Sequence, residues 1–299
     1  MTAPMTAMQT VEGNDLSGRV CVITGASSGL GRESARALAA AGAHVILAAR
    51  DREALSEAAR WVAAEVPGAR TSTVHLDLTA LDSVRAAAAA IRGITPAVHV
   101  LMNNAGVMFT PFGRTAEEFE LQIGTNHFGH FELTRLLVPQ LAAAGGARVV
   151  NLSSGGHRLG DVNLDDPNWE TRQYDKFEAY GASKTANILH ADEADRRLRD
   201  AGIRAFAVHP GTVATSLGRY MSREDFSRLR DLSAGTPLDL AGPGDGAATQ
   251  VWAAVAPELE GQGGLYLEDC RISDAAPYAR DARRAARLWE LSERLCGAG

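Results

Sequence analysis

The chain has 299 residues, 45% of them hydrophobic and 22% charged, enough to bury one large domain or two small ones. A net charge of -6 without a block of Lys or Arg argues against nucleic acid as a partner. No apolar run approaches about 18 residues, and the N-terminus lacks a signal-peptide pattern, so we expect a cytoplasmic protein with no membrane partner. Three scattered cysteines, Cys21, Cys270 and Cys296, lack metal-ligand spacing and predict no metal site.

From Arg19 onward, short β-branched runs alternate with longer helical patterns, which is typical of βαβ units and a parallel sheet. The expected strands are 19–24, 44–49, 71–76, 98–103, 147–152, 203–209 and 264–267. The expected helices are 30–42, 51–65, 80–92, 116–143, 177–201 and 243–256. We predict an α/β protein with a single-domain, doubly wound Rossmann-like fold over residues 15–299, in which helices flank a seven-stranded parallel sheet.

Three further segments are assigned by composition. Residues 1–14 are expected to form a flexible N-terminal arm, because they carry little apolar pattern. Residues 214–240 contain several charges and the stretch "LSAGTP", which indicates a mobile lid over a substrate. Residues 278–296 include "DARRAARLWELSERL", whose apolar positions predict an amphipathic C-terminal helix that packs on the body of the protein.

The stretch "TGASSGLG", residues 24–31, directly follows the first strand and opens the first helix. Glycines allow a tight turn there, and the N–H groups of a helix N-terminus favour the charge of a diphosphate. A nicotinamide dinucleotide site is therefore expected, although the spacing GxxxGxG differs from GxGxxG and a plain strand-to-helix turn is the alternative. The expected contacts are Gly25, Ser27, Ser28, Gly29, Leu30 and Gly31.

Arg50 ends the second strand, 19 residues after Gly31, where an acidic group would hold the ribose of NAD. A guanidinium suits a 2′-phosphate, so NADP(H) is preferred and NAD(H) remains possible. The alternative is a surface Arg50 paired with Asp51 or Glu53. Asp77, with Leu78 beside it, follows the third strand and is expected near the adenine, unless Asp77 only stabilises the next helix start.

The stretch "YGASK" places Tyr180 four residues before Lys184 in a helical pattern, so the two side chains share one face. A phenol is a poor base at neutral pH, but a nearby ammonium stabilises the phenolate and lowers the pKa of the tyrosine. The pair can therefore act as a general acid or base on one oxygen atom. The alternative is a solvated Tyr and Lys on an ordinary surface helix.

Further motifs occur in a characteristic order: "NNAG" (103–106), "TNHFGHFELT" (125–134), "NLSS" (151–154), "YGASK" (180–184) and "HPGTVATSL" (209–217). With the glycine turn, they make the chain resemble the short-chain dehydrogenase/reductase family. It is most similar to the retinol dehydrogenase and WW-domain oxidoreductase branch, without a WW domain or a membrane anchor. Ser154 and Tyr180 lie 26 residues apart, about twice the usual gap in the family, and the stretch between them is an additional loop.

The resemblance implies a catalytic tetrad of Asn126, Ser154, Tyr180 and Lys184, with Ser153 as the alternative serine. Tyr180 would exchange a proton with the substrate oxygen, Ser154 would hold that oxygen, and Asn126 would hold a water that links Lys184 to solvent. Lys184 would also bind the nicotinamide ribose. The remaining expected cofactor contacts are Asn104, Ala105, Gly106, Pro210, Gly211, Val213 and Thr215, together with Tyr180 and Lys184.

The expected function is an NADP(H)-dependent oxidoreductase that interconverts a hydrophobic ketone or aldehyde and its alcohol. A hydrophobic substrate is indicated by apolar loop residues expected over the nicotinamide: Met108, Phe109, Phe112, Trp169, Tyr174, Leu217 and Tyr220. His127, His130, His157 and His209 are expected to be structural. The alternative function is a catalytically silent protein that senses NADP(H). The resemblance also implies a homodimer or homotetramer formed through helices 116–143 and 177–201.

Overall fold

One mixed sheet forms the centre of the computed structural model, which describes residues 5–213, 216–232 and 241–297. The strand order is β3-β2-β1-β4-β5-β6-β7-β8, with β1 to β7 parallel and β8 antiparallel to β7. The strands are β1 (Val20–Thr24), β2 (His44–Ala49), β3 (Arg70–His75), β4 (Val100–Asn103), β5 (Ala147–Leu152), β6 (Ile203–His209), β7 (Leu265–Glu268) and β8 (Arg271–Ser273). The order reverses between β1 and β4, and ligands bind at such a point in open α/β sheets.

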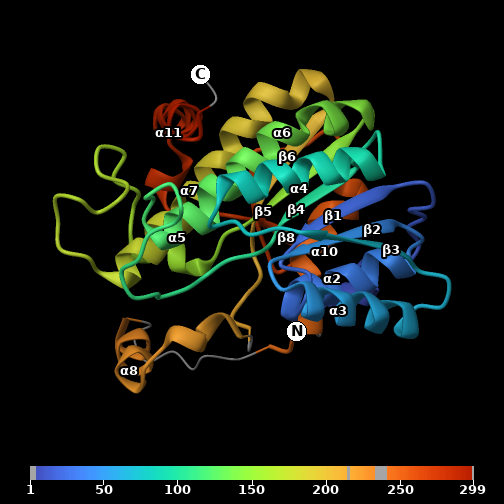
Figure 1. The fold of residues 1–299 in the computed structure, drawn as a ribbon, viewed down its shortest axis with the longest axis horizontal. Coiled ribbons are helices and arrows are strands. Elements are labelled where there is room, and N and C mark those ends of the chain that lie inside the picture. The colour runs from blue at the N-terminus through green and yellow to red at the C-terminus, as the bar shows by residue number, and fades with distance from the viewer. Residues whose placement is uncertain (1–4, 214–215, 233–240, 298–299) are drawn as a thin grey trace.

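Helices cover both faces of the sheet (Figure 1). One face carries α1 (Ala7–Thr10), α2 (Gly29–Ala40), α3 (Arg52–Glu65) and α10 (Ala248–Val255). The other carries α4 (Leu81–Ile94), α6 (Gly129–Ala143), α7 (Lys176–Leu198) and α11 (Ala282–Leu295). Cys21 and Ile23 pack toward the first group and Val22 toward the second, because successive side chains of a strand point to opposite faces. The predicted Rossmann-like α/β fold is confirmed.

The eighth strand was not predicted. Asp269 and Cys270 turn the chain back from β7 with φ values of 49° and 53°, and β8 then lies at the sheet edge with Ile272 53% exposed. In a sequence, two-residue hairpin turns are usually recognised by the residue pairs Asn-Gly or Asp-Gly. Asp-Cys followed by a short polar strand carries neither that signal nor a buried face, so the sequence pattern stops at the seventh strand.

The long helix predicted over 116–143 begins later, at Leu121. Glu118 has a φ of 62°, and the Glu120 side chain accepts the N–H groups of Gln122 and Ile123 at the start of α5 (Leu121–Ile123). A π-helical turn, η1 (Gly124–Phe128), then leads into α6. Such turns are frequent at functional sites, and this one contains Asn126. The helix predicted over 243–256 is likewise divided, into α9 (Pro243–Gly246) and α10.

The N-terminal segment is packed where we predicted a flexible arm. Thr6 and Gln9 form a capping box at the start of α1, and Ala7 and Val11 are buried in the core shared with α2 and α10. The two apolar residues are too few to give a helical period in the sequence. Residues 7–11 therefore belong to the body of the domain.

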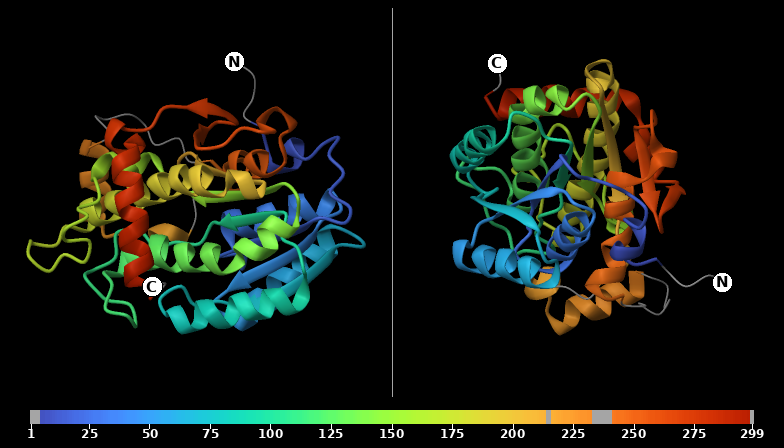
Figure 2. Two further views of the ribbon diagram at one scale, coloured as in Figure 1. Left: turned by 90° about the horizontal axis from the view of Figure 1, so that it is seen from above. Right: turned by 90° about the vertical axis from the view of Figure 1, so that its right-hand side faces the viewer.

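The C-terminal helix α11 lies across α7 (Figure 2). It buries Leu288 and Trp289, and the Trp289 ring packs edge-on against Phe131 of α6. The chain itself thus covers part of the helix face through which we predicted pairing with a second copy. In the described part of the chain, no helix is both long enough and apolar enough to cross a membrane.

Short helices complete the chain. The described part of the predicted lid contains η4 (Ser216–Tyr220) and α8 (Arg223–Leu232), which lies on the same side of the molecule as the loop after β5 (Figure 1). The other short helices are η2 (Gly155–Leu159), η3 (Arg199–Ala201), η5 (Pro257–Leu259) and η6 (Pro277–Arg280).

Candidate active site

The glycine turn after β1 is closed tightly against the loop after β4. A methyl group placed on Gly31 would lie 2.5 Å from Gly25 O and 2.6 Å from Asn104 Nδ2, and one on Gly25 would lie 2.9 Å from Ala105 Cα. The Asn104 side chain donates to Thr24 O at 2.7 Å, and the Asn104 N–H donates to Thr24 Oγ1 at 2.9 Å. The structure therefore brings Gly25, Gly31, Asn104 and Ala105 together, and only glycine fits at the two turn positions.

Helix α2 begins directly after this turn, and its first N–H groups have no partner within the helix. Ser28 stands at the N-cap position and is exposed, but its side chain accepts no cap hydrogen bond in the described structure. Gly29, with φ 53°, and Leu30 follow in a first turn without an acidic residue. A helix start with unsatisfied donors and no carboxylate suits a diphosphate, so the residues present fit a dinucleotide. Ser27 is half-buried beside this N-terminus.

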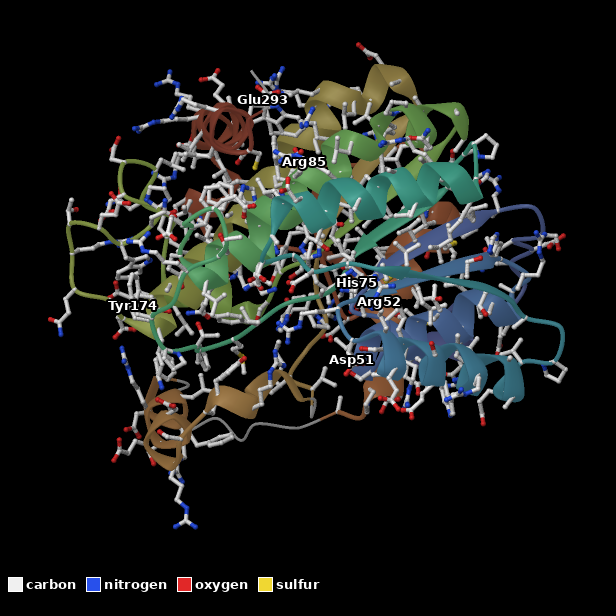
Figure 3. All side chains as sticks on the ribbon, viewed as in Figure 1. Asp51, Arg52, His75, Arg85, Tyr174 and Glu293 are labelled. Atoms are coloured by element: carbon white, nitrogen blue, oxygen red, sulfur yellow. The ribbon has the colours of Figure 1, made fainter. Side chains whose placement is uncertain are left out.

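Arg50 lies at the carboxyl end of β2, exposed to solvent and without a hydrogen bond or ion pair to any described residue. Asp51 does not pair with it, because the Asp51 carboxylate caps α3 by accepting from the N–H groups of Glu53 and Ala54. Figure 3 shows Asp51 at this helix start. Arg50 is thus an available cation beside the glycine turn.

Asp77 and Leu78 follow β3. Asp77 Oδ1 accepts from the Thr79 N–H at 2.9 Å and from Thr79 Oγ1 at 2.7 Å, so the carboxylate stabilises its own turn. Leu78 is buried, and a methyl group on Gly129 would lie 2.7 Å from Leu78 O. Both residues lie at the carboxyl edge of the sheet as predicted. One oxygen of the Asp77 carboxylate already accepts hydrogen bonds within its own turn.

Tyr180 and Lys184 lie on one face of α7, as their spacing predicts. Both are buried, Lys184 Nζ lies 5.7 Å from the centre of the Tyr180 ring, and the ammonium donates to Leu152 O at 3.0 Å. A methyl group on Gly106 would lie 3.6 Å from Lys184 Nζ and 3.0 Å from Asn126 Oδ1. The loop after β4 therefore passes close to Lys184 and Asn126 at Gly106.

Burial controls the protonation of the pair. It raises the pKa of Tyr180 to about 12, while a hydrogen bond with Ser154 lowers that pKa in part. Burial also lowers the pKa of Lys184 to about 8. We predicted that Lys184 would lower the pKa of Tyr180, but in the structure burial outweighs any such effect. Tyr180 therefore carries its proton at neutral pH.

The two serines after β5 have different surroundings. Ser153 is buried and its hydroxyl donates to the main-chain oxygen of Lys184 at 2.9 Å. Ser154 is half-buried, and its Oγ accepts the Gly156 N–H at 3.0 Å. A methyl group on Gly156 would lie 2.8 Å from Tyr180 Cε1 and 3.3 Å from Ser154 Oγ, and the side chains of Ser154 and Tyr180 are hydrogen-bonded to each other. This geometry favours Ser154 over Ser153 as the residue that meets a substrate oxygen.

Asn126 holds three segments together. Its Nδ2 donates to Val107 O at 3.0 Å and to Ser183 Oγ at 2.9 Å, and its Oδ1 accepts the Val107 N–H at 2.8 Å. The His130 ring in turn bonds the Asn126 main-chain oxygen at 3.0 Å and Thr24 Oγ1 at 2.9 Å. The Asn126 side chain thus joins η1 to α7 and to the loop after β4.

The turn after β6 carries the last predicted contacts. Gly211 has a φ of 81°, which explains the glycine after Pro210. Val213 pairs with Ala241, and a methyl group on Gly246 would lie 2.4 Å from Val213 Cγ2 and 2.9 Å from Leu30 Cδ2. Val213 therefore packs beside the N-terminus of α2. Thr215 lies outside the described residues.

An aromatic cluster adjoins Tyr180. The Phe109 ring stacks on Phe177 with centres 4.2 Å apart and meets the Tyr180 ring edge-on at 5.0 Å. Met221 and Leu229 of the lid segment pack against the same cluster. Two ion pairs anchor α8 to the start of α7: Lys176 with Asp225 at 2.5 Å and Arg228 with Asp175 at 2.8 Å. The site thus has an apolar wall beneath the lid helix.

Sequence reasoning missed a buried polar cluster behind this wall. Gln122 is fully buried; its Oε1 accepts the Phe109 N–H at 2.8 Å, and its Nε2 donates to Tyr174 Oη at 2.9 Å. Tyr174 Oη donates to Glu120 Oε1 at 3.0 Å. Figure 3 shows Tyr174 near the lid side of the molecule. Trp169 and Tyr174, which we predicted over the nicotinamide, pack edge-on against each other, and Phe109, with φ 52°, forms the inner wall.

The histidines named in the sequence do not form a metal site. Among the described residues, no group of three or more His, Cys, Asp or Glu side chains is arranged to hold a metal ion. His127 bonds Ser292 Oγ at 2.8 Å, while His209 lies 3.6 Å from Glu268. These contacts agree with structural roles.

Comparisons with known proteins agree with this architecture. The profile described as short chain dehydrogenase matches residues 19–225. Human retinol dehydrogenase 13 is 39% identical over 282 residues, which cover 94% of this chain and 85% of that protein. Human retinol dehydrogenase 12 is 39% identical over 283 residues, which cover 94% of this chain and 87% of that protein.

Solved structures are similar as well. A crystal structure of an uncharacterized protein from Mycobacterium paratuberculosis has a TM-score of 0.78 and 36% identity, over 99% of this chain and 98% of that one. The NADP active-site complex of Pseudomonas aeruginosa RhlG has a TM-score of 0.67 and 25% identity, over 85% of this chain and 95% of that one. The chain therefore belongs to the short chain dehydrogenase family, in the branch of the retinol dehydrogenases, and is an oxidoreductase.

Proposed function

We propose that this protein uses NADP(H) to interconvert a hydrophobic aldehyde or ketone and its alcohol, with Tyr180 as the general acid and base. One observation carries the proposal. The side chains of Tyr180 and Ser154 are hydrogen-bonded to each other, with the buried ammonium of Lys184 near the tyrosine ring. Two hydroxyl donors aimed at one point can bind and protonate a carbonyl oxygen.

Each residue then has a separate task. Ser154 Oγ accepts the Gly156 N–H, and its proton, which bonds Tyr180 in the free protein, can donate to the substrate oxygen instead. Tyr180, protonated at neutral pH because burial raises its pKa to about 12, transfers its proton to that oxygen in the reductive direction. Lys184 would bind the nicotinamide ribose and Asn126 keeps α7 in register with the loop after β4. When bound, the nicotinamide supplies or accepts the hydride.

The residues that would hold the cofactor favour NADP(H). The uncapped start of α2 suits the diphosphate, and Asn104 and Ala105 close the turn beneath it. Arg50 is exposed and unpaired with any described residue, so it can bind a 2′-phosphate without breaking an existing ion pair. RhlG, which is 25% identical, is named as an NADP complex, which supports the same preference.

The wall of the site favours an apolar substrate. Phe109, Phe177, Met221 and Leu229 pack around Tyr180, and the lid helix α8 is fixed above them by ion pairs. Relatives that are 38–39% identical are named retinol dehydrogenases. We therefore expect a long-chain or polyene aldehyde or ketone, or the matching alcohol, rather than a sugar.

The test is a set of turnover assays with NADPH or NADH and a panel of retinal, long-chain aldehydes, steroid ketones and sugars. We expect carbonyl-dependent oxidation of NADPH with the apolar compounds, and a shift toward NADH in Arg50→Asp because the acidic side chain repels a 2′-phosphate and accepts from a ribose hydroxyl. Tight NADPH binding without turnover of any carbonyl would refute the enzyme and favour an NADP(H) sensor. Unchanged NADPH preference in Arg50→Asp would refute the role of Arg50.

A further inference from the structure

A histidine holds the turn that carries Ser154 in place by hydrogen bonds. His157 is fully buried, three residues after Ser154 on η2. Its Nδ1 lies 2.7 Å from the main-chain oxygen of Ser154, and its main-chain N–H donates to the same oxygen at 3.0 Å. The Ser154 carbonyl thus receives two hydrogen bonds from one residue, while its hydroxyl oxygen receives a third from Gly156.

The opposite side of the imidazole determines its tautomer. Nε2 lies 3.0 Å from the backbone nitrogen of Ala276, which can only donate, so Nε2 accepts and Nδ1 carries the ring proton. That proton points at the Ser154 carbonyl. The neutral ring is therefore satisfied at both nitrogens, and a change at either one would disturb the other.

A segment distant in the chain supplies this anchor. Ala276 is buried and follows β8, 119 residues after His157. Tyr278 of η6 donates its hydroxyl to the main-chain oxygen of His157 at 2.9 Å, and Thr185 of α7 donates to the same oxygen at 3.2 Å. The segment between β8 and α11 thus bonds His157, and through it holds the turn that carries Ser154.

We propose that His157 is a positioning residue for the reaction: its Nδ1–H bond to the Ser154 carbonyl keeps Ser154 Oγ aligned with Tyr180, and Ala276 orients the ring. This inference rests on the proposed function. It extends the site to residues 276–278, which lie beyond the part of the chain matched by the family profile. A shift of the serine by about 1 Å would lower turnover by about 100-fold, because two donors must meet one oxygen.

Two substitutions separate the two bonds. Asparagine carries its amide nitrogen as many bonds from Cβ as Nδ1 of histidine, whereas glutamine reaches the position of Nε2. His157→Asn should retain the bond to Ser154, and its kcat should stay within about fivefold of wild type. His157→Gln should retain only the bond to Ala276, and its kcat should fall by about 10- to 100-fold with KM nearly unchanged.

A double variant tests whether His157 acts through Ser154. Ser154→Ala alone should lower kcat by about 100-fold, and adding His157→Gln should lower it no further. The matched control is His99→Gln, because His99 Nδ1 also accepts a backbone N–H, that of Val20, at the far end of β1. That variant should keep kcat within about twofold of wild type.

Three results would overturn the proposal. The first is the reverse order of activity, with His157→Asn inactive and His157→Gln active. The second is a further loss of kcat in the double variant. The third is an equal loss of turnover in His99→Gln. Nitrogen NMR of the imidazole rings needs neither substrate nor a variant that folds: we expect Nδ1 of His157 to carry the proton at neutral pH, and an Nε2–H ring would refute the bond. A wild type inactive on every carbonyl would refute the proposed function, while the NMR result would still decide the bond.

Discussion

The two halves of the site are built in different ways. The half around the glycine turn consists of backbone: a methyl group on Gly31 would meet Gly25 O at 2.5 Å, and Asn104 bonds the main chain of Thr24. The half around Tyr180 consists of side chains from distant segments, such as Gln122 bonded to Tyr174 and His157 bonded to Ala276.

This difference teaches what each half tolerates. A backbone cradle binds a part common to all dinucleotides, so its requirement is an absence of side chains at a few positions. A side-chain wall determines which substrate fits and how its oxygen is presented, so its requirement is spread over many positions. Substitutions in the first half should affect cofactor binding, and substitutions in the second half should affect turnover and substrate binding.

Tyr180→Phe should give the largest effect and the cleanest separation of the halves. The ring and its contacts with Phe109 remain, but the proton donor is lost, so we expect kcat to fall by about 10³- to 10⁴-fold. NADPH affinity, measured by fluorescence titration, should stay within about threefold of wild type. Turnover close to that of wild type would exclude Tyr180 as the acid and base.

Gly31→Ala should produce the opposite pattern. Its methyl group would force the backbone at Gly25 and the Asn104 amide apart, so we expect NADPH affinity to fall by about 100-fold, measured by the same titration. Gly93→Ala in α4 is the matched control, because a methyl group there meets nothing within 4 Å. The control should bind NADPH normally and gain about 0.5–1 kcal/mol of stability. Normal binding by Gly31→Ala would show that the turn does not form the cofactor site.

Acid should destabilise the protein through three buried histidines. Burial lowers the pKa of His130 to about 4, that of His190 to about 3 and that of His127 well below its usual value. The unfolded chain binds protons below about pH 6.5 while the folded rings stay neutral, so stability is lost as the pH falls from there. Between pH 6.5 and 5.5 each ring contributes a loss of about 1 kcal/mol.

Asp192 opposes this loss, because burial raises the pKa of its carboxyl to about 7. The folded state then binds a proton that the unfolded chain does not, and it gains about 1 kcal/mol over the same interval. Urea unfolding should therefore show a loss of stability from pH 6.5 to pH 5.5 in the wild type, and a loss about 1 kcal/mol larger in Asp192→Asn. Equal stability at the two pH values in both proteins would contradict the buried neutral histidines.

Tyr174→Phe should give the smallest effect and sharpen the account of the side-chain half. The variant keeps the ring but removes the hydroxyl that bonds Glu120, Gln122 and the Thr110 carbonyl. We expect a loss of about 1–2 kcal/mol in stability by urea unfolding, because buried Glu120 and Gln122 each lose a partner. The KM for the carbonyl should rise about threefold as Phe109 loosens, with NADPH affinity unchanged. A change in NADPH affinity alone would contradict the division into halves.

The sequence predicts the glycine turn and the pairing of Tyr180 with Lys184 better than the side-chain contacts around them. "TGASSGLG" and "YGASK" are local patterns, and the turn and the helix face that they imply are present. The partners of Gln122 and His157 lie 52 and 119 residues away, and no spacing in the sequence signals contacts that only the packed fold creates. The predicted lowering of the Tyr180 pKa did not hold for the same reason. The charge of Lys184 is visible in the sequence, whereas the burial that raises the pKa is not.

The most direct test follows the hydride. The protein is mixed with NADPH deuterated at the transferring position and with a hydrophobic aldehyde, and the alcohol is analysed by mass spectrometry. We predict one deuterium on the carbinol carbon with the wild type, and under the same conditions about 10³-fold less labelled alcohol with Tyr180→Phe. Tight NADPH binding by both proteins, with no labelled alcohol from any aldehyde of the panel, would contradict the account.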